Sequence, residues 1–404
     1  MIKPSNVDRY LNSKNQPTYS RLNFDAFLKE VAFKFTKDAI HITGTNGKGS
    51  TAYFLSSVLK NSNYKVGRFI SPCFTFFYEM ISINDREIRP SEFVEILNEY
   101  YEAIERHQLT QFEILTFIAL TYFNRQKINL ALIEVGMGGK IDATNIFRPI
   151  LSIITNVSVE HTAYLGATTK EIAMHKAGII KKKVAVLVGN MPLDAFSVIA
   201  ATAMKKDAPL YGVKAPLNIK VSRDGICFDA LDYKNICLGI PASYEASNAA
   251  LALNALEIIA NKYPVDRDLV FKSMKNVKIP ARFSIVGERP LFIIDGAHNP
   301  MALSALINSI KMLNKKKLHI VFASFKDKDV EQAFDLFALS DADVVTTTFN
   351  HSRARNEIDY NSYYPFVEDY HQAIEMMSEK AQEDEVILVT GSLYFAQLVY
   401  SERG

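Results

Sequence analysis

The sequence predicts an α/β protein of two domains, each built on a mostly parallel sheet. Two observations carry this expectation. Short apolar runs rich in β-branched residues alternate with longer segments of helical periodicity, as in a parallel sheet covered by helices. This alternation stops near Pro280 and then starts again. The length of 404 residues suits two to three domains at about 150 residues each. We therefore expect a larger domain over residues 1–280 and a smaller one over residues 281–404.

The expected strands of the first domain are unbroken apolar runs, which is typical of strands buried on both faces. Segments with the apolar spacing of helices packed on a sheet lie between these runs. We expect strands at residues 39–43, 130–135, 151–155 and 184–188, and helices at residues 51–61, 90–106 and 112–124.

The end of the first domain has a different pattern. Short alternating runs with a turn signal at Asp224-Gly225 predict a small β-hairpin region within residues 208–240, and an Ala- and Leu-rich helix begins near Tyr244. Beyond residue 280 the alternation of strands and helices returns. We expect strands at residues 291–294, 319–323, 344–348 and 386–389, and a helix at residues 302–313.

The amino-acid composition and the net charge indicate what class of protein this is and which classes of partner are excluded. Hydrophobic residues make up 48% and charged residues 22% of the chain, as in an average soluble domain. A net charge of +2 provides no field to attract nucleic acid or an acidic membrane, and we expect neither as a partner. The longest dense apolar stretch, residues 114–123, is too short to span a bilayer. The cysteines Cys73, Cys227 and Cys237 are too sparse for a disulfide framework, so we expect a cytoplasmic protein.

The segment HITGTNGKGST at residues 41–51 carries the strongest chemical signal. An apolar strand runs into a Gly-rich turn and then into a helix. This architecture cradles phosphates, because glycines allow close backbone approach and the N–H groups at a helix N-terminus point at anionic oxygens. Lys48 adds a mobile cation, and Ser50 or Thr51 offers a hydroxyl to Mg²⁺. We expect a P-loop-type sheet domain, with a shorter variant of the generic phosphate loop.

Two further strand ends carry candidate metal ligands. Glu134 ends an apolar run, and a carboxylate beside a phosphate loop is a natural Mg²⁺ ligand, although a lone acid there also fits a helix cap. Glu160 and His161 follow the next strand, and Lys176 comes shortly after them. The residues alone favour a hydrogen-bonded histidine over a metal ligand at position 161 and assign no role to Lys176.

Seven short motifs occur in a specific order over nearly the whole chain: GTNGKGS, Ser71-Pro72, IEVGMGGKIDATN, VEHTAYLG, HKAGI, PARF and DGAHNP. In this combination the sequence resembles the folylpolyglutamate synthases of the Mur ligase superfamily, in particular the bacterial bifunctional dihydrofolate synthase/folylpolyglutamate synthases. The resemblance implies a P-loop-type, mostly parallel sheet domain followed by a smaller Rossmann-like α/β domain. It also implies an ATP-dependent ligase that adds L-glutamate to 7,8-dihydropteroate and to the γ-carboxyl of tetrahydrofolates through an acyl phosphate.

The resemblance implies roles for individual residues. ATP would be clamped between the domains by Asn46, Gly47, Lys48, Gly49, Ser50, Asn248, Arg282 and Asp295. Two Mg²⁺ ions would be coordinated by Ser71, Glu134 and His161, and the catalytic residues would be Lys48, Lys176 and His298. Lys176 matches a lysine that is modified to a carbamate. His298 and Ser392 would position the incoming glutamate.

The acceptor would be contacted by Thr110, Gln111, Phe112, Glu113, Ile141, Asp142 and Ala143. Two of these residues also fit purely structural roles. Phe112 fits an aromatic side chain of the core, and His298 fits a cap on the helix that begins near Pro300. Residues 325–329 resemble the family's DKD segment and also fit a surface charge cluster. The sequence departs from the family at Cys73, where a histidine is usual, and at residues 17–22, which do not match the N-terminal pterin loop.

Two other functions compete with this interpretation. One is another Mur-type amino-acid ligase acting on cell-wall precursors, which the DGAHNP segment and the two-domain length argue against. The other is a P-loop regulatory ATPase that hydrolyses ATP without joining substrates. For the folate-glutamate ligase the expected partners are small molecules only, namely dihydropteroate, reduced folates and L-glutamate, and we expect a monomer.

Overall fold

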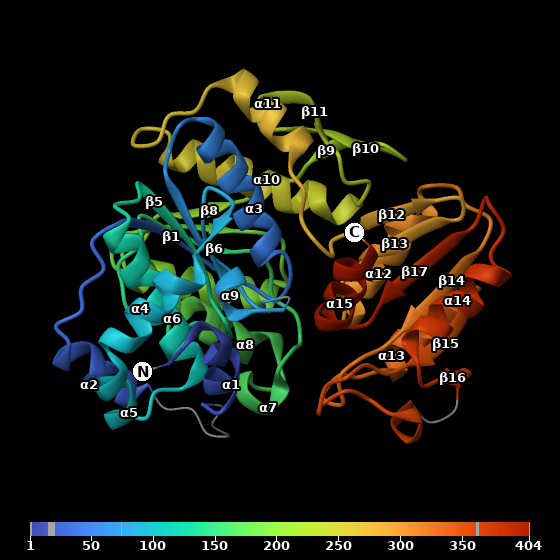
Figure 1. The fold of residues 1–404 in the computed structure, drawn as a ribbon. Coiled ribbons are helices and arrows are strands. Elements are labelled where there is room, and N and C mark those ends of the chain that lie inside the picture. The colour runs from blue at the N-terminus through green and yellow to red at the C-terminus, as the bar shows by residue number, and fades with distance from the viewer. Residues whose placement is uncertain (1, 15–20, 74, 361–362, 404) are drawn as a thin grey trace. The chain divides into compact units, whose positions relative to one another are not determined.

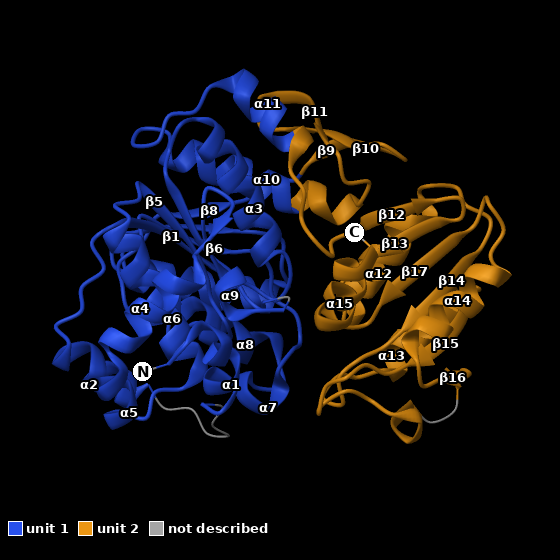
Figure 2. Cartoon of the chain, viewed as in Figure 1, with its two compact units in different colours: residues 1–215, 248–274 blue, residues 216–247, 275–404 orange. Residues whose placement is uncertain are grey.

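A computed structural model describes residues 2–14, 21–73, 75–360 and 363–403, and it confirms the α/β class (Figure 1). Residues 17–20 of the segment compared with the pterin loop lie outside this set. The chain forms two compact units, unit 1 with residues 1–215 and 248–274 and unit 2 with residues 216–247 and 275–404 (Figure 2). The domain limits expected from the sequence stay a prediction. Within the described residues, no helix is both long and apolar enough to cross a membrane.

A sheet of eight strands forms the centre of unit 1 in the described part of the chain, in the order β4-β3-β2-β5-β1-β6-β7-β8. The strands from β2 to β8 in this order run parallel, and β3 and β4 continue the sheet antiparallel. Their bounds are β1 (Asp38–Thr43), β2 (Val66–Phe69), β3 (Ile81–Ile83), β4 (Arg86–Glu87), β5 (Leu130–Glu134), β6 (Leu151–Ile154), β7 (Ala185–Val188) and β8 (Leu210–Gly212). The parallel direction brings the carboxyl ends of β2, β5, β1 and β6 to one edge, where ligands bind in open α/β sheets.

Some helices of this part of the chain begin at a side-chain cap or a proline. Pro90 opens α4, and a Thr110–Glu113 capping box opens α6. The helix expected at residues 90–106 is broken at Tyr100, whose φ of −108° and ψ of 10° leave the helical region. The bounds are α1 (Val7–Asn12), α2 (Leu22–Glu30), α3 (Lys48–Asn61), α4 (Pro90–Glu99), α5 (Tyr101–Arg106), α6 (Gln111–Arg125), α7 (Thr162–Leu165), α8 (Thr169–Lys176), α9 (Leu193–Lys205), α10 (Ser243–Ile259) and α11 (Arg267–Asn276), with 3₁₀ turns η1 (Pro4–Asn6), η2 (Phe77–Met80) and η3 (Ala177–Ile179).

Unit 2 holds a second sheet, with the strand order β12-β13-β17-β14-β15-β16 among the described residues. β12 is antiparallel to β13, and the other neighbours are parallel. The bounds are β12 (Ser284–Glu288), β13 (Leu291–Ile294), β14 (Leu318–Phe322), β15 (Asp343–Thr347), β16 (Phe366–Val367), β17 (Val386–Thr390), α12 (Pro300–Lys311), α13 (Glu331–Leu339), α14 (Tyr370–Lys380), α15 (Leu393–Arg403) and the 3₁₀ turn η4 (Glu357–Tyr360). The carboxyl ends of β13, β17 and β14 share an edge.

The hairpin region expected at residues 208–240 contributes a small antiparallel sheet, β9 (Leu217–Ser222), β10 (Gly225–Ala230) and β11 (Tyr233–Leu238). Cys227 and Cys237 face each other in the register of β10 and β11, with Cα atoms 4.1 Å apart, and form a disulfide. This pairing corrects the expectation from cysteine count alone, because a tight turn brings two residues ten positions apart into a cross-strand pair. Cys73 is the free cysteine.

Candidate active site

The phosphate loop joins β1 to α3 at the carboxyl edge of the first sheet. Gly47 caps α3 with a φ of +81°, and a Cβ atom built there would lie 2.2 Å from Asn248 Oδ1. Gly44 approaches the residue that follows β6 even more closely, because a Cβ atom there would lie 1.8 Å from Thr155 Oγ1. Both positions therefore exclude larger residues. The contact at Gly47 also places Asn248, an expected ATP ligand from α10, directly against the loop.

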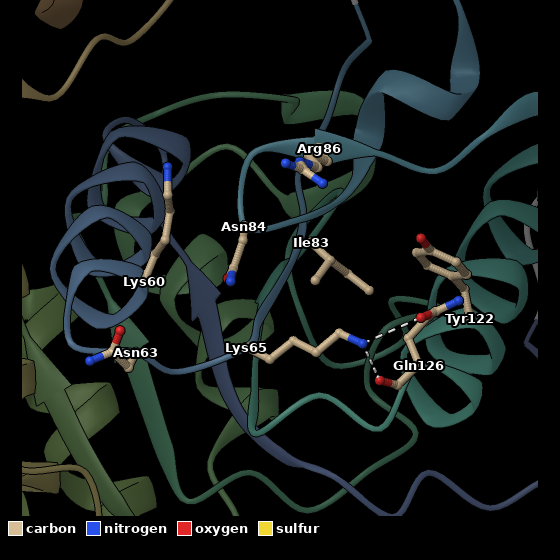
Figure 3. A pocket seen from close by; sticks show the side chains of 8 residues that line it. All are labelled: Lys60, Asn63, Lys65, Ile83, Asn84, Arg86, Tyr122 and Gln126. Carbon is tan, nitrogen blue, oxygen red and sulfur yellow. Dashed lines mark hydrogen bonds between the residues drawn. The ribbon is translucent and has the colours of Figure 1, made fainter.

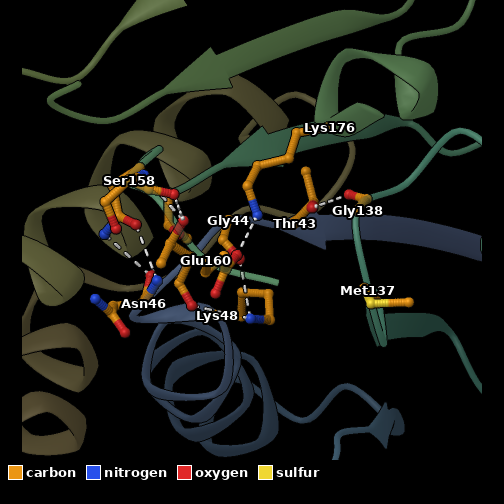
Figure 4. Close-up of polar contacts among 12 residues, drawn as sticks. Thr43, Gly44, Asn46, Lys48, Met137, Gly138, Ser158, Glu160 and Lys176 are labelled. Atoms are coloured by element: carbon orange, nitrogen blue, oxygen red, sulfur yellow. Dashed lines mark hydrogen bonds and ion pairs between the residues drawn. The ribbon is translucent and has the colours of Figure 1, made fainter. Parts of the chain in front are cut away.

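The segment that follows β6 holds this loop in place (Figure 4). The side-chain oxygen of Asn156 accepts a hydrogen bond from the Asn46 N–H at 2.9 Å, and Thr155 Oγ1 donates to the Asn46 carbonyl at 2.6 Å. Ser158 N–H donates to Thr45 Oγ1 at 3.0 Å. These bonds fix the loop backbone from its sides, and the N-terminus of α3 is where an anion is stabilised.

Lys48 is the first residue of α3, and its ammonium group turns back over the loop. Its Nζ atom donates to the carbonyl oxygens of Gly44 at 2.9 Å and Thr45 at 3.1 Å, and it lies 3.9 Å from Glu134 Oε1. Glu134 is 5% exposed at the end of β5. Lys48, which is expected to bind phosphate, and Glu134, which is expected to bind the metal, thus lie next to each other.

Lys176, at the end of α8, is buried and forms an ion pair with Glu160, with 2.7 Å between Nζ and Oε1 (Figure 4). Burial lowers the pKa of Lys176 to about 8, although the Glu160 charge opposes this and the Lys48 charge adds to it. Burial would raise the pKa of Glu160, but the charges of Lys176 and Lys48 outweigh it and lower that pKa to about 2. Two lysines and two carboxylates therefore form one electrostatic group around the phosphate loop.

The expected metal ligands follow strands of the same edge. Ser71 comes after β2, Glu134 ends β5, and His161 precedes α7 with a φ of +47°. A group of three or more His, Cys, Asp or Glu side chains arranged to hold a metal is absent from the described residues. Judged by donor chemistry, the Glu134 carboxylate and the Ser71 hydroxyl fit Mg²⁺, which prefers oxygen, whereas the exposed His161 imidazole fits it less well.

Phe112, an expected acceptor residue, contacts the loop that follows β5 at this edge. Its half-buried ring lies against Gly136, where a Cβ atom would be 2.6 Å from the ring, and it stacks on Phe69 with centroids 5.8 Å apart. Thr110 and Glu113 hydrogen-bond each other in the capping box of α6. The structure thus gives these two residues a part in starting the helix, while Gln111 and Phe112 lie on its first turn.

The loop after β5 carries the remaining expected acceptor residues. Ile141 is 48% exposed, whereas Asp142 and Ala143 are buried. Asp142 accepts backbone hydrogen bonds from Met137 and Thr144, each at 2.9 Å, and one from the Thr144 hydroxyl. Burial raises the pKa of this carboxyl group. Asp142 therefore orders the loop, and Ile141 is the side chain of the three that the loop presents to solvent.

In unit 2, the buried carboxylate of Asp295 binds three hydrogen-bond donors from separate segments. It accepts hydrogen bonds from the Tyr244 hydroxyl at 2.6 Å and from the N–H groups of Phe283 and Ala297, both at 2.8 Å. Burial raises the pKa values of both Asp295 and Tyr244. Arg282 lies beside the same segment, because a Cβ atom at Gly296 would be 2.8 Å from its Nη1. These expected ATP contacts lie at the end of β13.

The expected glutamate residues lie on neighbouring strand ends of the second sheet. His298 follows β13 and Ser392 follows β17, and both Gly391 N–H and Thr390 Oγ1 bond to the Ala297 carbonyl. Asn299, rather than His298, caps α12, since its side-chain oxygen accepts from the Ala302 N–H at 2.9 Å. The helix-cap alternative for His298 is therefore wrong. Residues 325–329 follow β14 at the same edge.

A separate hollow of about 680 Å³ lies at the opposite, amino edge of the first sheet (Figure 3). Two of its three cations are already engaged: Lys60 pairs with Asp85 at 2.8 Å, and Lys65 donates to the Gln126 carbonyl at 2.6 Å. The ends of α3 and α6 contribute further carbonyl oxygens there, which disfavours an anion. We assign no ligand to it. The lining residues are Lys60, Asn63, Lys65, Ile83, Asn84, Arg86, Tyr122 and Gln126.

The contacts that the sequence did not predict are mostly long-range. Thr155 and Asn156 hold the phosphate loop from more than a hundred positions away, and Glu160 is the partner of Lys176. A signal for Glu160 was present, since it precedes His161 at a strand end. Nothing in the local sequence indicates Thr155 or Asn156.

Comparison with known proteins adds two family matches. Residues 42–256 match the Mur ligase middle domain, and residues 281–393 match the Mur ligase glutamate ligase domain. The sequence is 32% identical to the folylpolyglutamate synthase of Lacticaseibacillus casei over 380 residues, which cover 89% of this chain and 88% of the relative. It is 31% identical to the dihydrofolate synthase/folylpolyglutamate synthase of Bacillus subtilis, with 88% of each chain covered.

Solved structures show the same likeness. The folylpolyglutamate synthase of Mycobacterium tuberculosis, complexed with ADP and AMPPCP, aligns with a TM-score of 0.91 and 26% sequence identity. The alignment covers 99% of this chain and 98% of the other. The similarity therefore extends over both units and is not confined to the phosphate loop.

Proposed function

The chain belongs to the folylpolyglutamate synthase and dihydrofolate synthase group of the Mur ligase family, as its motifs suggest, and from this premise we propose its reaction and its site. It is an ATP-dependent ligase that joins L-glutamate to folate compounds. We propose that it accepts both 7,8-dihydropteroate, giving dihydrofolate, and the γ-carboxyl group of tetrahydrofolates. The observation that carries the proposal is the phosphate loop with Lys48 beside Glu134, Glu160 and Lys176.

The first step needs a phosphate held near an acceptor carboxylate. The acceptor oxygen attacks the γ-phosphorus of ATP, the bond to the bridging oxygen breaks, and ADP leaves with an acyl phosphate formed. The N–H groups of residues 47–50 would bind the phosphates, with Asn248 against the loop, while the Asn46 N–H is held by Asn156. Lys48, which now donates to carbonyl oxygens of its own loop, has the reach to follow the charge that develops on the transferred group.

In the second step the glutamate amine attacks the acyl carbonyl and phosphate leaves, so that an amide forms. We propose that His298 and Ser392, on adjacent strand ends of unit 2, position the glutamate, and that the half-buried ring of Phe112 contacts the pterin. The neutral acyl carbonyl needs a neutral amine, so the ammonium group must lose a proton first. His298 is the titratable side chain of this set.

Mg²⁺ is part of the proposal. Ser71 and Glu134 would hold it through oxygen, His161 would contribute an imidazole, and a second ion would share this set. When bound, the metal neutralises phosphate charge and orients the polyphosphate. We further propose that Lys176 is carbamylated, because its lowered pKa supplies the neutral amine that this modification requires.

The test is ADP release and mass detection of the amide product with Mg-ATP, L-glutamate and either 7,8-dihydropteroate or tetrahydrofolate. Omission of each substrate in turn is the control. Glutamate-dependent product from both acceptors supports the full proposal. Product from tetrahydrofolate alone restricts the enzyme to chain extension. Cys73, where the family usually has a histidine, would then accompany the loss of dihydropteroate as an acceptor. ATP consumption with product from neither acceptor contradicts the proposal and favours a regulatory ATPase.

We propose that the enzyme acts as a monomer in the cytoplasm on small molecules alone. The near-neutral net charge of +2 supports the absence of a nucleic-acid or membrane partner. Light scattering at micromolar concentration tests the monomer, and a mass twice that of the chain contradicts it.

A further inference from the structure

One face of β1 carries two polar side chains that reach the loop after β5. His41 and Thr43 are two positions apart, so their side chains leave the strand on the same side. Both are fully buried, although a polar group in the centre of a parallel sheet costs stability unless it is hydrogen-bonded. Each has a partner in the loop of residues 136–145, which begins where β5 ends.

The first contact is a chain of two hydrogen bonds that joins three buried side chains. His41 Nε2 lies 2.9 Å from Thr144 Oγ1, and the same hydroxyl is bonded to Asp142 Oδ1. The hydroxyl has one hydrogen. When that hydrogen goes to the Asp142 carboxylate, the hydroxyl oxygen accepts from His41, which assigns the proton to Nε2. Burial lowers the pKa of His41 to about 3, so the ring is neutral at physiological pH, and Nδ1 has no hydrogen-bond partner in the described part of the chain.

The second contact is shorter and more direct. Thr43 Oγ1 donates to the Gly138 carbonyl at 2.7 Å (Figure 4). Thr43 directly precedes Gly44, where the phosphate loop begins. The two contacts therefore hold the loop of residues 136–145 at two points, and the strand that supplies them is the strand that delivers the phosphate loop. We call these two hydrogen bonds the β1 contacts.

We propose that His41, Thr43 and Thr144 are positioning residues: through the β1 contacts they fix the loop of residues 136–145, and with it the acceptor carboxylate, relative to the phosphate loop. This inference rests on the proposed function, in which that loop contacts the acceptor. A displacement of the acceptor by a fraction of an ångström costs rate in a transfer that depends on positioning. None of the three residues needs to touch a substrate.

The test compares Thr144→Val and Thr43→Val, which keep the side-chain shape and remove the hydroxyl, with Thr144→Ser, which keeps the hydroxyl. Thr116→Val is the matched control, because Thr116 is also a buried threonine of unit 1 and its hydroxyl makes no hydrogen bond with the described residues. For each variant, kcat and KM are measured for the acceptor that the wild type uses and for ATP. ADP affinity is measured by titration calorimetry, and folding by thermal unfolding.

We expect Thr144→Val and Thr43→Val to raise the acceptor KM or lower kcat by about tenfold, the effect of one lost hydrogen bond. ADP affinity should stay within about twofold, and Thr144→Ser and Thr116→Val should resemble the wild type. A merely structural role would lower ADP affinity and the unfolding temperature in parallel with turnover. If Thr144→Val does not fold, Thr43→Val leaves the Asp142 bonds intact and gives the same comparison.

Three results overturn the inference. Acceptor constants that do not change in folded Thr144→Val and Thr43→Val, with an active wild type, contradict the β1 contacts as positioning elements and leave the proposed function standing. If kcat/KM for ATP and kcat/KM for the acceptor fall by the same factor, the three residues have a structural role only. A wild type that forms no glutamate-dependent product contradicts the proposed function, and the inference falls with it.

Discussion

Replacement of Lys176 by arginine tests the proposed carbamate directly. A carbamate forms when the lone pair of a neutral amine attacks CO₂ and the nitrogen loses a proton, so the neutral fraction sets the yield. With a pKa of about 8, about a quarter of the Lys176 amines are neutral at pH 7.5, against about one in a thousand for a lysine with the ordinary pKa near 10.4. Burial thus raises the reactive population about two-hundredfold, and arginine, which stays charged, has no such population.

The assay uses protein prepared without CO₂ and then supplied with ¹³C-bicarbonate. We expect a carbamate signal in the ¹³C NMR spectrum of the wild type and none from this position in Lys176→Arg. Glutamate-dependent ADP release should fall on CO₂ removal and return with bicarbonate in the wild type, and it should be low and bicarbonate-independent in the variant. Because the neutral amine increases with pH, the carbamate signal should grow from about pH 6.5 to about pH 8.5.

Lys181 provides the matched control for this experiment. Burial and the neighbouring charges of Lys206 and Arg21 lower its pKa to about 8 as well, but Lys48, the cation of the phosphate loop, is not among the groups that act on it. Lys181→Arg should therefore keep the signal and the bicarbonate dependence. A signal that survives in Lys176→Arg, or a wild-type activity that ignores CO₂ removal, refutes the reasoning.

Three further predictions concern single groups. Gly47→Ala should weaken ADP binding at least about tenfold in calorimetry, because its Cβ atom would lie 2.2 Å from Asn248 Oδ1 and the φ is +81°; unchanged affinity would show that the loop does not bind phosphate. The pKa of Glu160, lowered to about 2, gives stability that is present above about pH 4.3 and lost as pH falls towards 2, about 2 kcal/mol between pH 6 and pH 3 in denaturant unfolding; Glu160→Gln should lack this loss. Reduction of the Cys227–Cys237 disulfide, whose cysteines are ten residues apart, should cost about 2–3 kcal/mol in urea, and superimposable curves with and without reductant would contradict it.

The part of the site that the sequence predicts is the part that is local in the chain. The phosphate loop, Lys48 and the helix behind it are consecutive, so glycine spacing and apolar periodicity suffice to place them. The strand-end position of Glu134 follows in the same way. The break between α4 and α5 at Tyr100 does not, because the apolar period continues through it and the backbone leaves the helical region at that residue alone.

The contacts that escape prediction depend on strand order and register. Asn156 reaches the phosphate loop because β6 is the neighbour of β1, and Asn248 reaches Gly47 from a helix two hundred positions away. Cys227 and Cys237 bond because the hairpin register sets them opposite each other. A single sequence contains the strands but not their order, so these partners become visible only in the folded chain.

Three buried carboxyl groups show why burial by itself does not mark a functional acid. Asp142 and Asp295 are held by N–H and hydroxyl donors, and burial raises the pKa of each, at Asp295 against the opposing charge of Arg282. The side chain of Glu160 is still 11% exposed and mostly out of water, but two lysine charges outweigh the effect of burial and lower its pKa. The first two carboxyl groups are satisfied by the loops they order, so a change there acts on positioning. As long as Lys176 is unmodified, the charge of Glu160 is balanced by Lys48 and Lys176, so its removal acts on the electrostatics of the phosphate loop.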